Sequence, residues 1–341
     1  MNQQPDSAPP DPTVVFETLT AHQRTAALLT AIEIGLYRAI GEGVNDATGL
    51  AARCNASERG IRILCDYLVV IGLLGKTDGR FVHTPTTAVF LDPASPTSLA
   101  PMARFLGGPA LQEPFRQLSE IVRSGRTVLP GQGTVEPENP VWVEFAHSMA
   151  PMMAPIAAPL AECALEGLEG AVQVLDIAAG HGLFGIGVAT QNPAARIVAV
   201  DWAPVLEVAS ANARKAGVAD RYETLAGSAF EVDFGGPYDV ALLTNFLHHF
   251  DRATCVALLT KVRRALTPRG RAATLDFVPN EDRVSPPMAA AFAMTMLGTT
   301  QSGDAYTFKE YEGMYREAGF ARVTARPIPH APHTIVTGYA S

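Results

Sequence analysis

Short apolar runs alternate with longer helical patterns through the second half of the chain. From residue 170 onward, runs rich in β-branched and apolar residues are separated by segments of helical periodicity. The expected strands are 172–177, 197–200, 221–226, 240–243, 272–276, 322–327 and 334–338. Strands alternating with helices favour a doubly wound α/β fold with a mostly parallel sheet. A helix over 311–319, followed by the last two strands, predicts an antiparallel edge to this sheet.

The first third of the chain has a different pattern, in which short amphipathic helices precede a hairpin. Thr20 and Ser57 are the expected N-caps of two of these helices, because a hydroxyl there can accept from the first free N–H groups. Helices followed by a hairpin are typical of a winged helix, so residues 13–106 are predicted to form a separate α-helical domain. The expected elements are helices over 21–40, 46–54 and 58–71 and a hairpin over 73–83 that turns at Asp78-Gly79.

Three further segments differ in composition from both domains. Residues 1–12 are polar and rich in proline, which predicts a disordered tail. Helical patterns over 99–124 and 141–168 flank a Gly/Pro-rich linker over 127–140. We therefore expect residues 107–169 to form a helical linker and pocket region that precedes an α/β domain spanning residues 170–341.

A glycine turn follows the first strand of the α/β domain. The sequence Val172 to Gly182 is an apolar strand that carries Asp176 near its end and continues into A-A-G-H-G. A glycine turn between a strand and a helix brings backbone N–H groups close to a nucleotide-like ligand. The next strand ends at Asp201, where an acid can accept hydrogen bonds from the ribose hydroxyls of an adenosine.

The turn departs from the dinucleotide-binding pattern in two ways. Ala178 takes the place of the first glycine, and Asp176 lies just before the turn. A carboxylate at that position would repel a pyrophosphate but suits a ligand with a cationic amino-acid end. The combination with Asp201 predicts S-adenosylmethionine as the cofactor.

A second segment with chemical potential spans residues 239–251. An apolar strand ends at Thr244-Asn245, at the sheet edge where α/β proteins bind ligands, and His248 and His249 follow. A histidine beside a methyl donor can take the proton of a substrate hydroxyl, which contributes roughly 10²–10⁴-fold to a rate. His248 is the expected general base, with helix capping or core packing as its alternative. For His249 the packing alternative is favoured.

These motifs together resemble the small-molecule O-methyltransferases related to the caffeic-acid and acetylserotonin enzymes. The resemblance rests on V-L-D-I-A-A-G-H-G, on Val200-Asp201 and on L-H-H-F-D at 247–251, and it extends over nearly the whole chain. It implies that the N-terminal domain dimerises and that His248 is the base, with Asp276 as its acidic partner. From the residue patterns and this resemblance together, the expected cofactor-binding residues are Asp176, Gly180, Gly182, Asp201, Trp202, Ser228, Ala229, Phe230, Thr244 and Asn245.

Three positions depart from the family pattern. Ser228 replaces an aspartate that holds the adenine, and Thr244 replaces a lysine near the cofactor. A second acidic partner of the base is missing near Ala305.

The expected acceptor site is apolar and aromatic, which suggests an aromatic or otherwise hydrophobic small-molecule substrate. F-A-H-S-M at 145–149 resembles a family segment beside the active site. Methionines at helical spacing are also common in plain cores, so core packing is the alternative. The candidate acceptor-binding residues are Phe145, Met149, Met153, His249, Phe292 and Met296.

Composition narrows the classes of function. Hydrophobic residues make up 48% and charged residues 18% of the 341 residues, and the net charge is −8. This acidic balance argues against nucleic-acid binding. We expect no membrane partner, because the pattern predicts no apolar run of transmembrane length. Four scattered cysteines without a CxxC pair predict reduced thiols, and the N-terminus lacks a signal-peptide pattern. We therefore expect a cytoplasmic protein.

Two alternatives remain open at this stage. A winged helix can bind DNA, but the helix over 58–71 balances its two arginines with Glu58 and Asp66. A metal-assisted C-methyltransferase of an α-keto acid could use His248 and His249 with His330 or His333. Their spacing matches no metal signature, so no metal is predicted.

Overall fold

The computed structural model describes residues 10–341, which fall into two compact units with the boundary after Gly107. Each unit is described by itself. The predicted tail over 1–12 lies outside the described residues for its first nine positions. Apart from Gly107, the residues of the expected linker and pocket region over 107–169 group with the α/β domain in the second unit.

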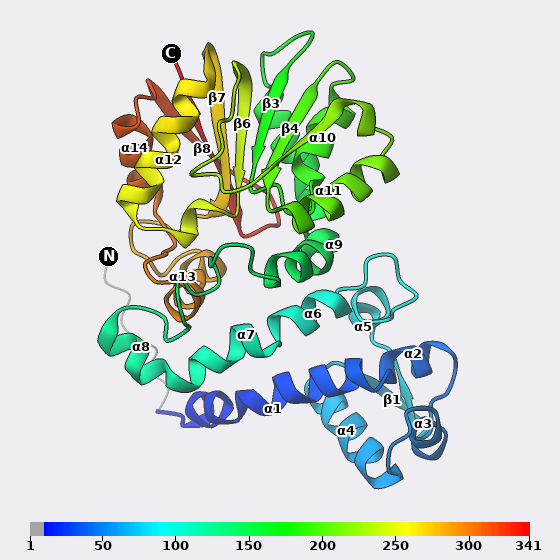
Figure 1. The fold of residues 1–341 in the computed structure, drawn as a ribbon. Helices are drawn as coiled ribbons and strands as arrows, with labels where there is room; N and C mark the ends of the chain where they lie inside the picture. The colour runs from blue at the N-terminus through cyan, green and yellow to red at the C-terminus, as the bar shows by residue number, and fades with distance from the viewer. Residues whose placement is uncertain (1–9) are drawn as a thin grey trace. The chain divides into compact units, whose positions relative to one another are not determined.

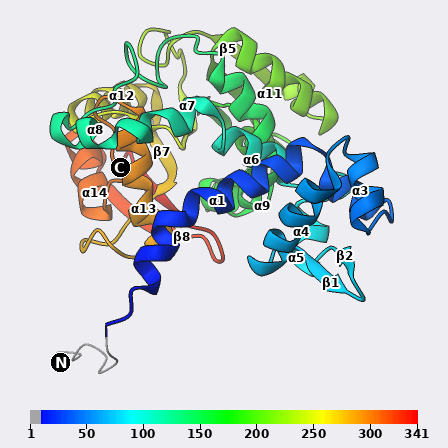
Figure 2. The same cartoon turned by 90° about the horizontal axis from the view of Figure 1, so that it is seen from below.

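The first unit is a small α-helical domain with a two-stranded hairpin. Its core is closed by apolar side chains that are fully buried, such as Leu36, Leu50 and Leu68. The hairpin strands lie beside α4 and α5, away from the N-terminal end of α1 (Figure 2). In chain order the elements are α1 (Thr13–Glu33), α2 (Leu36–Gly41), α3 (Ala47–Arg53), α4 (Glu58–Val70), β1 (Gly75–Thr77), β2 (Arg80–Val82), α5 (Pro85–Phe90) and α6 (Ala100–Leu106).

Local sequence signals explain where most of these helices begin. The side chain of Ser57 accepts a hydrogen bond from the Gly60 N–H at 3.1 Å, which confirms it as the N-cap of α4. The hairpin turn at Asp78-Gly79 is also confirmed. The prediction that Thr20 caps the first helix was wrong, because α1 begins at Thr13 and Thr20 bonds back to the Phe16 carbonyl. Two helices occupy the range of the expected helix over 21–40. The helix breaks between α1 and α2, where Gly35 takes a left-handed conformation.

Several helices precede the sheet in the second unit. Prolines divide the expected helical region over 99–124, because α7 (Pro109–Gln112) and η1 (Glu113–Gln117) each contain one in the first turn. α8 (Leu118–Ser124) follows. Residues 127–140 contain no helix or strand beyond one isolated bridge to Thr300, as expected of a linker.

Helix α9 (Val141–Leu165) is long and apolar, and it corrects one expectation. By length and composition alone this helix could cross a membrane, so the prediction that no apolar run reaches transmembrane length was wrong. Half of its most apolar stretch is buried within the protein, where the helix packs against α10. Its three internal prolines are four residues apart and therefore lie on one stripe of the helix.

The second unit is built on a seven-stranded sheet with the order β5-β4-β3-β6-β7-β9-β8. Strands β3 to β7 pair in parallel, and β9 is antiparallel to both β7 and β8. All seven predicted strands are confirmed, although β7 begins six residues early, across a register shift against β6. Their bounds are β3 (Gln173–Ile177), β4 (Arg196–Asp201), β5 (Tyr222–Ala226), β6 (Tyr238–Thr244), β7 (Leu266–Phe277), β8 (Arg322–Pro327) and β9 (His333–Tyr339).

Helices cover both faces of this sheet. α9, α10 (Leu183–Gln191) and α11 (Ala203–Lys215) gather on one face, while α12 (Arg252–Ala265) and α14 (Phe308–Glu317) cover the other (Figure 1). The chain leaves β3 for β4 and β5 on one side and then returns to place β6 on the other side of β3. This topological switch point lies between β3 and β6, and ligands of open α/β sheets bind outside the carboxyl ends of strands at such a point.

Candidate active site

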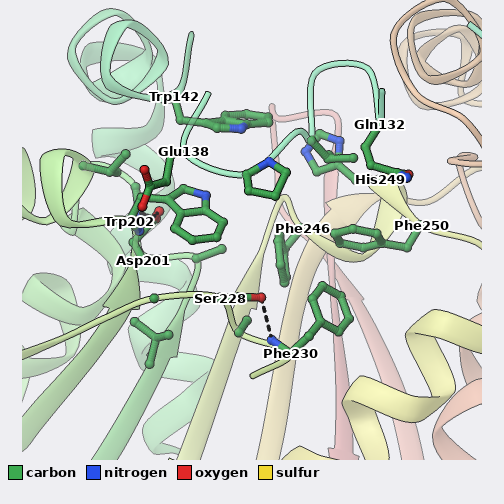
Figure 3. Close-up of a pocket in the computed structure, with 18 of the residues that line it drawn as sticks. Gln132, Glu138, Trp142, Asp201, Trp202, Ser228, Phe230, Phe246, His249 and Phe250 are labelled. Carbon is green, nitrogen blue, oxygen red and sulfur yellow. Dashed lines mark hydrogen bonds between the residues drawn. The ribbon is translucent and has the colours of Figure 1, made fainter. Parts of the chain in front are cut away.

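A cavity of about 530 Å³ lies at the carboxyl ends of β3, β4 and β6. Its floor is formed by residues at the ends of these strands or just after them, among them Gly180, Asp201 and Asn245. Trp142 from α9 lies across its upper side, with Glu138 from the preceding linker beside it (Figure 3). A pocket of this size at a switch point is suited to a cofactor-sized ligand.

The glycine turn forms one wall of the cavity. Ala178, Gly180 and Gly182 all have positive φ, at 54°, 57° and 75°. At Gly182 a Cβ atom would lie 2.7 Å from the Tyr222 hydroxyl, so no larger residue fits there. The Gly180 N–H donates to Asp201 at 2.8 Å, which ties the turn to the end of the next strand.

Two carboxylates lie at the turn, the fully buried Asp176 and the half-buried Asp201. Asp176 accepts from the Gly185 N–H at 3.1 Å, while its other oxygen has no hydrogen-bond partner among residues 10–341. Burial raises the pKa of Asp176 to about 7 and that of Asp201 to about 6. Removing a carboxylate from water disfavours its charged form, and a cationic ligand beside it would stabilise that form again.

Aromatic rings form the opposite wall. The rings of Phe230, Phe246 and Phe250 lie 5.0 to 6.2 Å from one another, and Trp202 faces them across the cavity (Figure 3). Ser228 accepts a hydrogen bond from the Phe230 N–H at 3.2 Å, so its hydroxyl shapes the turn that carries Phe230. A slot between aromatic rings suits a flat heteroaromatic group.

The two histidines lie in the 3₁₀ helix η3 (Leu247–His249) and differ in their surroundings. The His248 Nδ1 lies 2.6 Å from an oxygen of Asp276, and both side chains are almost fully buried. An ionised carboxylate can only accept a hydrogen bond, so Nδ1 carries the hydrogen and donates it. Nε2 of the neutral ring is then the acceptor. The sequence-based pairing of His248 with Asp276 thus corresponds to a direct contact.

His249 lines the cavity, and the buried His248 packs against it from behind the lining. The centroids of the two rings are 4.3 Å apart, and Trp142 packs edge-on against His249 at 5.2 Å. Burial, together with the nearby His248, holds the pKa of His249 well below its usual range. Its Nδ1 is buried without a hydrogen-bond partner in the described chain. His249 is therefore a neutral polar group in the cavity wall.

The predicted acceptor-binding residues divide into two groups. Phe145 and His249 line the cavity. Met149, Met153 and Met296 are buried and do not line it, and Phe292 packs edge-on against His248 at 4.8 Å. Of the predicted cofactor residues, Asp176 and Gly182 lie behind the lining, while the other eight form it.

The sequence predicted a pocket region over 107–169 but named no residue of the linker over 127–140 as part of the site. Gln132, Val135, Pro137 and Glu138 all line it, together with Gln301 and Ser302 from the turn after α13 (Pro287–Thr299). Hydrogen bonds from Thr127 and Thr134 to the end of α13 hold the linker in place. The available signal was its length, because long loops without secondary structure often cover a site.

The histidines considered as metal ligands do not gather. Within residues 10–341 the structure brings together no group of three side chains suited to a metal ion. His333 is buried in β9 against the Phe277 ring, and His330 is exposed.

The fold and the site define the class of the protein. Residues 137–321, more than half of the chain, match the O-methyltransferase domain, and residues 16–93 match the O-methyltransferase dimerisation domain. The chain belongs to this family and is an S-adenosylmethionine-dependent O-methyltransferase. The dimerisation domain supports a homodimer, and the family assignment favours this activity over DNA regulation and metal-assisted C-methylation.

Among its relatives is a solved structure from Nostoc punctiforme, itself described as a candidate O-methyltransferase. It is 48% identical, with a TM-score of 0.94 and coverage of 97% of this chain and 100% of that one. The 3-hydroxy-5-methyl-1-naphthoate 3-O-methyltransferase of Streptomyces sahachiroi is 27% identical over 96% of this chain and 95% of its own. Human N-acetylserotonin methyltransferase, solved with S-adenosylmethionine, shares the fold at 19% identity with a TM-score of 0.84, covering 98% and 99% of the two chains.

The residues of the cavity fit S-adenosylmethionine. Asp176 and Asn245 each leave a buried oxygen without a partner in the part of the chain described. Asp201, Glu138 and Glu231 add acidic groups to the cavity wall, which suits a ligand that carries a sulfonium and an ammonium.

Proposed function

We propose that His248 is the general base in the methylation of a hydroxyl on a small aromatic acceptor. The observation that carries this proposal is the buried 2.6 Å contact between the His248 Nδ1 and Asp276. The contact holds the imidazole in one tautomer and leaves Nε2 free to accept a proton. Asp276 also stabilises the imidazolium that forms when the proton is taken.

The base is needed because a neutral phenol is a poor nucleophile. An ordinary histidine has a pKa of about 6.5 and a phenol one of about 10, so full deprotonation before transfer is unfavourable. Proton transfer to Nε2 during formation of the new C–O bond avoids that penalty. Help of this kind contributes roughly 10²–10⁴-fold to the rate.

The cofactor-binding roles are proposed on the same basis. Asp201 would accept the ribose hydroxyls, and the adenine would lie in the slot between Trp202 and the three phenylalanines. The unpartnered oxygens of Asp176 and Asn245 lie at the turn and at the end of β6, where they can face the amino-acid part of the cofactor. S-adenosylmethionine supplies the methyl group when bound.

An aromatic acceptor is supported by the cavity wall and by a relative. Trp142 and Phe145 lie edge to face with their ring centroids 5.6 Å apart, and both line the cavity beside His249. The Streptomyces sahachiroi relative is named for a hydroxynaphthoate. Stacking on such rings favours a flat substrate, so we infer a hydroxylated aromatic acid or a related polycyclic phenol.

The test compares two adjacent histidine variants on an acceptor panel that includes hydroxynaphthoates. His248→Ala is expected to lower kcat about 10²–10⁴-fold with nearly unchanged affinity for S-adenosylhomocysteine. His249→Ala is expected to lower it less, because its ring does not contact Asp276. Turnover in His248→Ala equal to that of the unmodified enzyme would exclude the base role.

A chelator separates the metal-assisted alternative from this proposal. Full turnover in EDTA is expected, with product mass spectrometry locating the new methyl group on oxygen. Loss of turnover in EDTA would favour metal-assisted C-methylation instead.

We also infer a cytoplasmic location. All four cysteines are unpaired, and three of them are buried, which is compatible with a reducing compartment.

A further inference from the structure

The far side of Asp276, away from His248, is occupied by a tyrosine. The hydroxyl of Tyr311, on α14, donates to Oδ2 of Asp276 at 2.7 Å. Tyr311 and Asp276 are both fully buried. A helix near the C-terminus, a central strand and the turn that carries His248 therefore meet at one carboxylate.

The hydrogen bonds of Asp276 divide between its two oxygens. Oδ1 accepts from the His248 Nδ1 at 2.6 Å and from the Phe277 N–H at 2.8 Å, while Oδ2 accepts from Tyr311. A carboxylate with donors on both oxygens cannot rotate about its Cβ–Cγ bond without breaking one of them. Tyr311 thus fixes the plane of the group that orients His248.

No acid takes the part of a second partner at this point of the chain. Ala305 is fully buried and apolar. The side chain of the neighbouring Asp304 accepts a hydrogen bond from the Ala305 N–H and forms an ion pair with Arg283. Tyr311 is the group that contacts the carboxylate instead. Burial and the nearby carboxylate raise the pKa of Tyr311 far above its usual range, so the phenol stays a donor.

Other titratable groups surround the pair. Cys255 of α12 and Tyr315 of α14 lie close enough to influence Asp276 or Tyr311, and His249 and His333 lie close enough to influence His248 or to be influenced by it. Each of these four groups is held in its neutral form by burial, which raises the pKa of the thiol and the phenol and lowers that of the histidines.

We infer that Tyr311 is a positioning residue for the base, which holds Asp276 so that the Nδ1–H tautomer and the orientation of His248 are maintained. The inference rests on the proposed role of His248. It extends the His248–Asp276 pair to a chain of three side chains, Tyr311–Asp276–His248, in which Tyr311 contacts neither cofactor nor acceptor.

The protein contains a matched control one helical turn away. Tyr315 is also fully buried on α14, but its hydroxyl bonds to the Thr274 hydroxyl at 2.7 Å rather than to Asp276. Tyr311→Phe and Tyr315→Phe each remove one buried hydroxyl from the same helix. Any general effect on core packing is therefore common to the two variants.

The first measurement needs no acceptor. In enzyme with ¹⁵N-labelled histidine rings, the nitrogen shifts should identify the Nδ1–H tautomer of His248, assigned by its loss in His248→Ala. Tyr311→Phe is expected to displace this resonance, and Tyr315→Phe is expected to leave it in place. Equal spectra for the two tyrosine variants would overturn the inference.

The second measurement is the pH dependence of kcat for the full-length enzyme. Without the donor at Oδ2 the carboxylate becomes more basic and holds the His248 proton more tightly. The acid limb should therefore move to higher pH, and kcat near neutrality should fall about 10-fold with little change in KM for the cofactor. Tyr315→Phe is expected to keep the original profile.

A third variant covers the case in which Tyr311→Phe does not fold. 3-Fluorotyrosine placed at position 311 keeps the ring in place and strengthens the donor, so the acid limb should move to lower pH. An unchanged limb would contradict the inference. Retained turnover in His248→Ala would instead overturn the proposed function, so the two failures can be told apart.

Discussion

Ala178 adopts a left-handed backbone conformation, which glycine reaches more easily than a residue with a Cβ atom. Its φ of 54° lies in the left-handed region, which costs an L-residue about 1–2 kcal/mol. We expect Ala178→Gly to stabilise the protein by about 1 kcal/mol and raise its melting temperature by about 2–4 °C. Differential scanning calorimetry can measure this change. Gly180→Ala, at a φ of 57°, should lower the melting temperature and serves as the opposite control.

We expect the carboxylates of Asp176 and Asp201 to make cofactor binding depend on pH. In the folded protein the pKa values of Asp176 and Asp201 are raised to about 7 and about 6, above those of the unfolded chain. Their contribution to stability is therefore present at low pH and is lost as the pH rises through 6 and 7. A cationic cofactor favours their ionised forms, so its affinity should rise between pH 5 and 7.5.

Titration calorimetry can detect the protons that such binding releases. The apparent heat of binding at pH 6.5 should vary with the ionisation heat of the buffer, and the variation should shrink in Asp201→Asn. A pH-independent affinity with no buffer effect would contradict a role for these carboxylates in binding the cofactor.

At the scale of elements, the linker over 127–140 has the most direct consequence for binding. Its anchors are the Thr127 hydroxyl, 2.6 Å from the Gly298 carbonyl, and Thr134, which bonds to Thr299. Thr127→Val with Thr134→Val should weaken cofactor affinity several-fold and speed its release, because the linker lines the cavity. Stopped-flow fluorescence of Trp142 and Trp202 can follow the release. Thr190→Val, at a hydroxyl bonded within α10, is the control.

The strands and the glycine turn could be predicted from sequence because their signals are local. Apolar runs ending in Asp176 and Asp201 specify both a strand and its functional end. A pocket region over 107–169 was expected, but the linker residues that line the cavity could not be identified, since their position depends on contacts with α13, more than 160 residues away in sequence. The bond from Tyr311 to Asp276 escaped prediction for the same reason, because nothing near Tyr311 in sequence distinguishes it from Tyr315.

At the scale of the whole molecule, one end of α1 exposes an apolar surface. Val14, Phe16 and Leu19 are 64–66% exposed, and the latter two lie within residues 16–93, which match the family's dimerisation domain. Burying such side chains contributes roughly 1.5–3 kcal/mol each, so we expect them to contact the second subunit. Phe16→Asp with Leu19→Asp should shift the protein toward monomer in analytical ultracentrifugation.

A control for this experiment lies in the other unit. Val284 is 70% exposed, outside the dimerisation domain, and Val284→Asp should leave the dimer intact. A double variant in α1 that remains fully dimeric at micromolar concentration would show that this surface lies outside the subunit contact.

If Asp176 and Asp201 hold the cofactor as proposed, they would connect the lifetime of the enzyme in the cell to the supply of methyl donor. Asp176 is fully buried and Asp201 is half-buried in the cavity wall, so a bound cation would favour the charged form of both. A ligand at about 100 times its dissociation constant stabilises the folded state by about 2.7 kcal/mol. When the donor pool falls, the enzyme spends more time in unfolded forms that proteases degrade. Starvation for methionine should therefore lower the abundance of this enzyme as well as its turnover, so that methyl groups are withheld from its product while they are scarce.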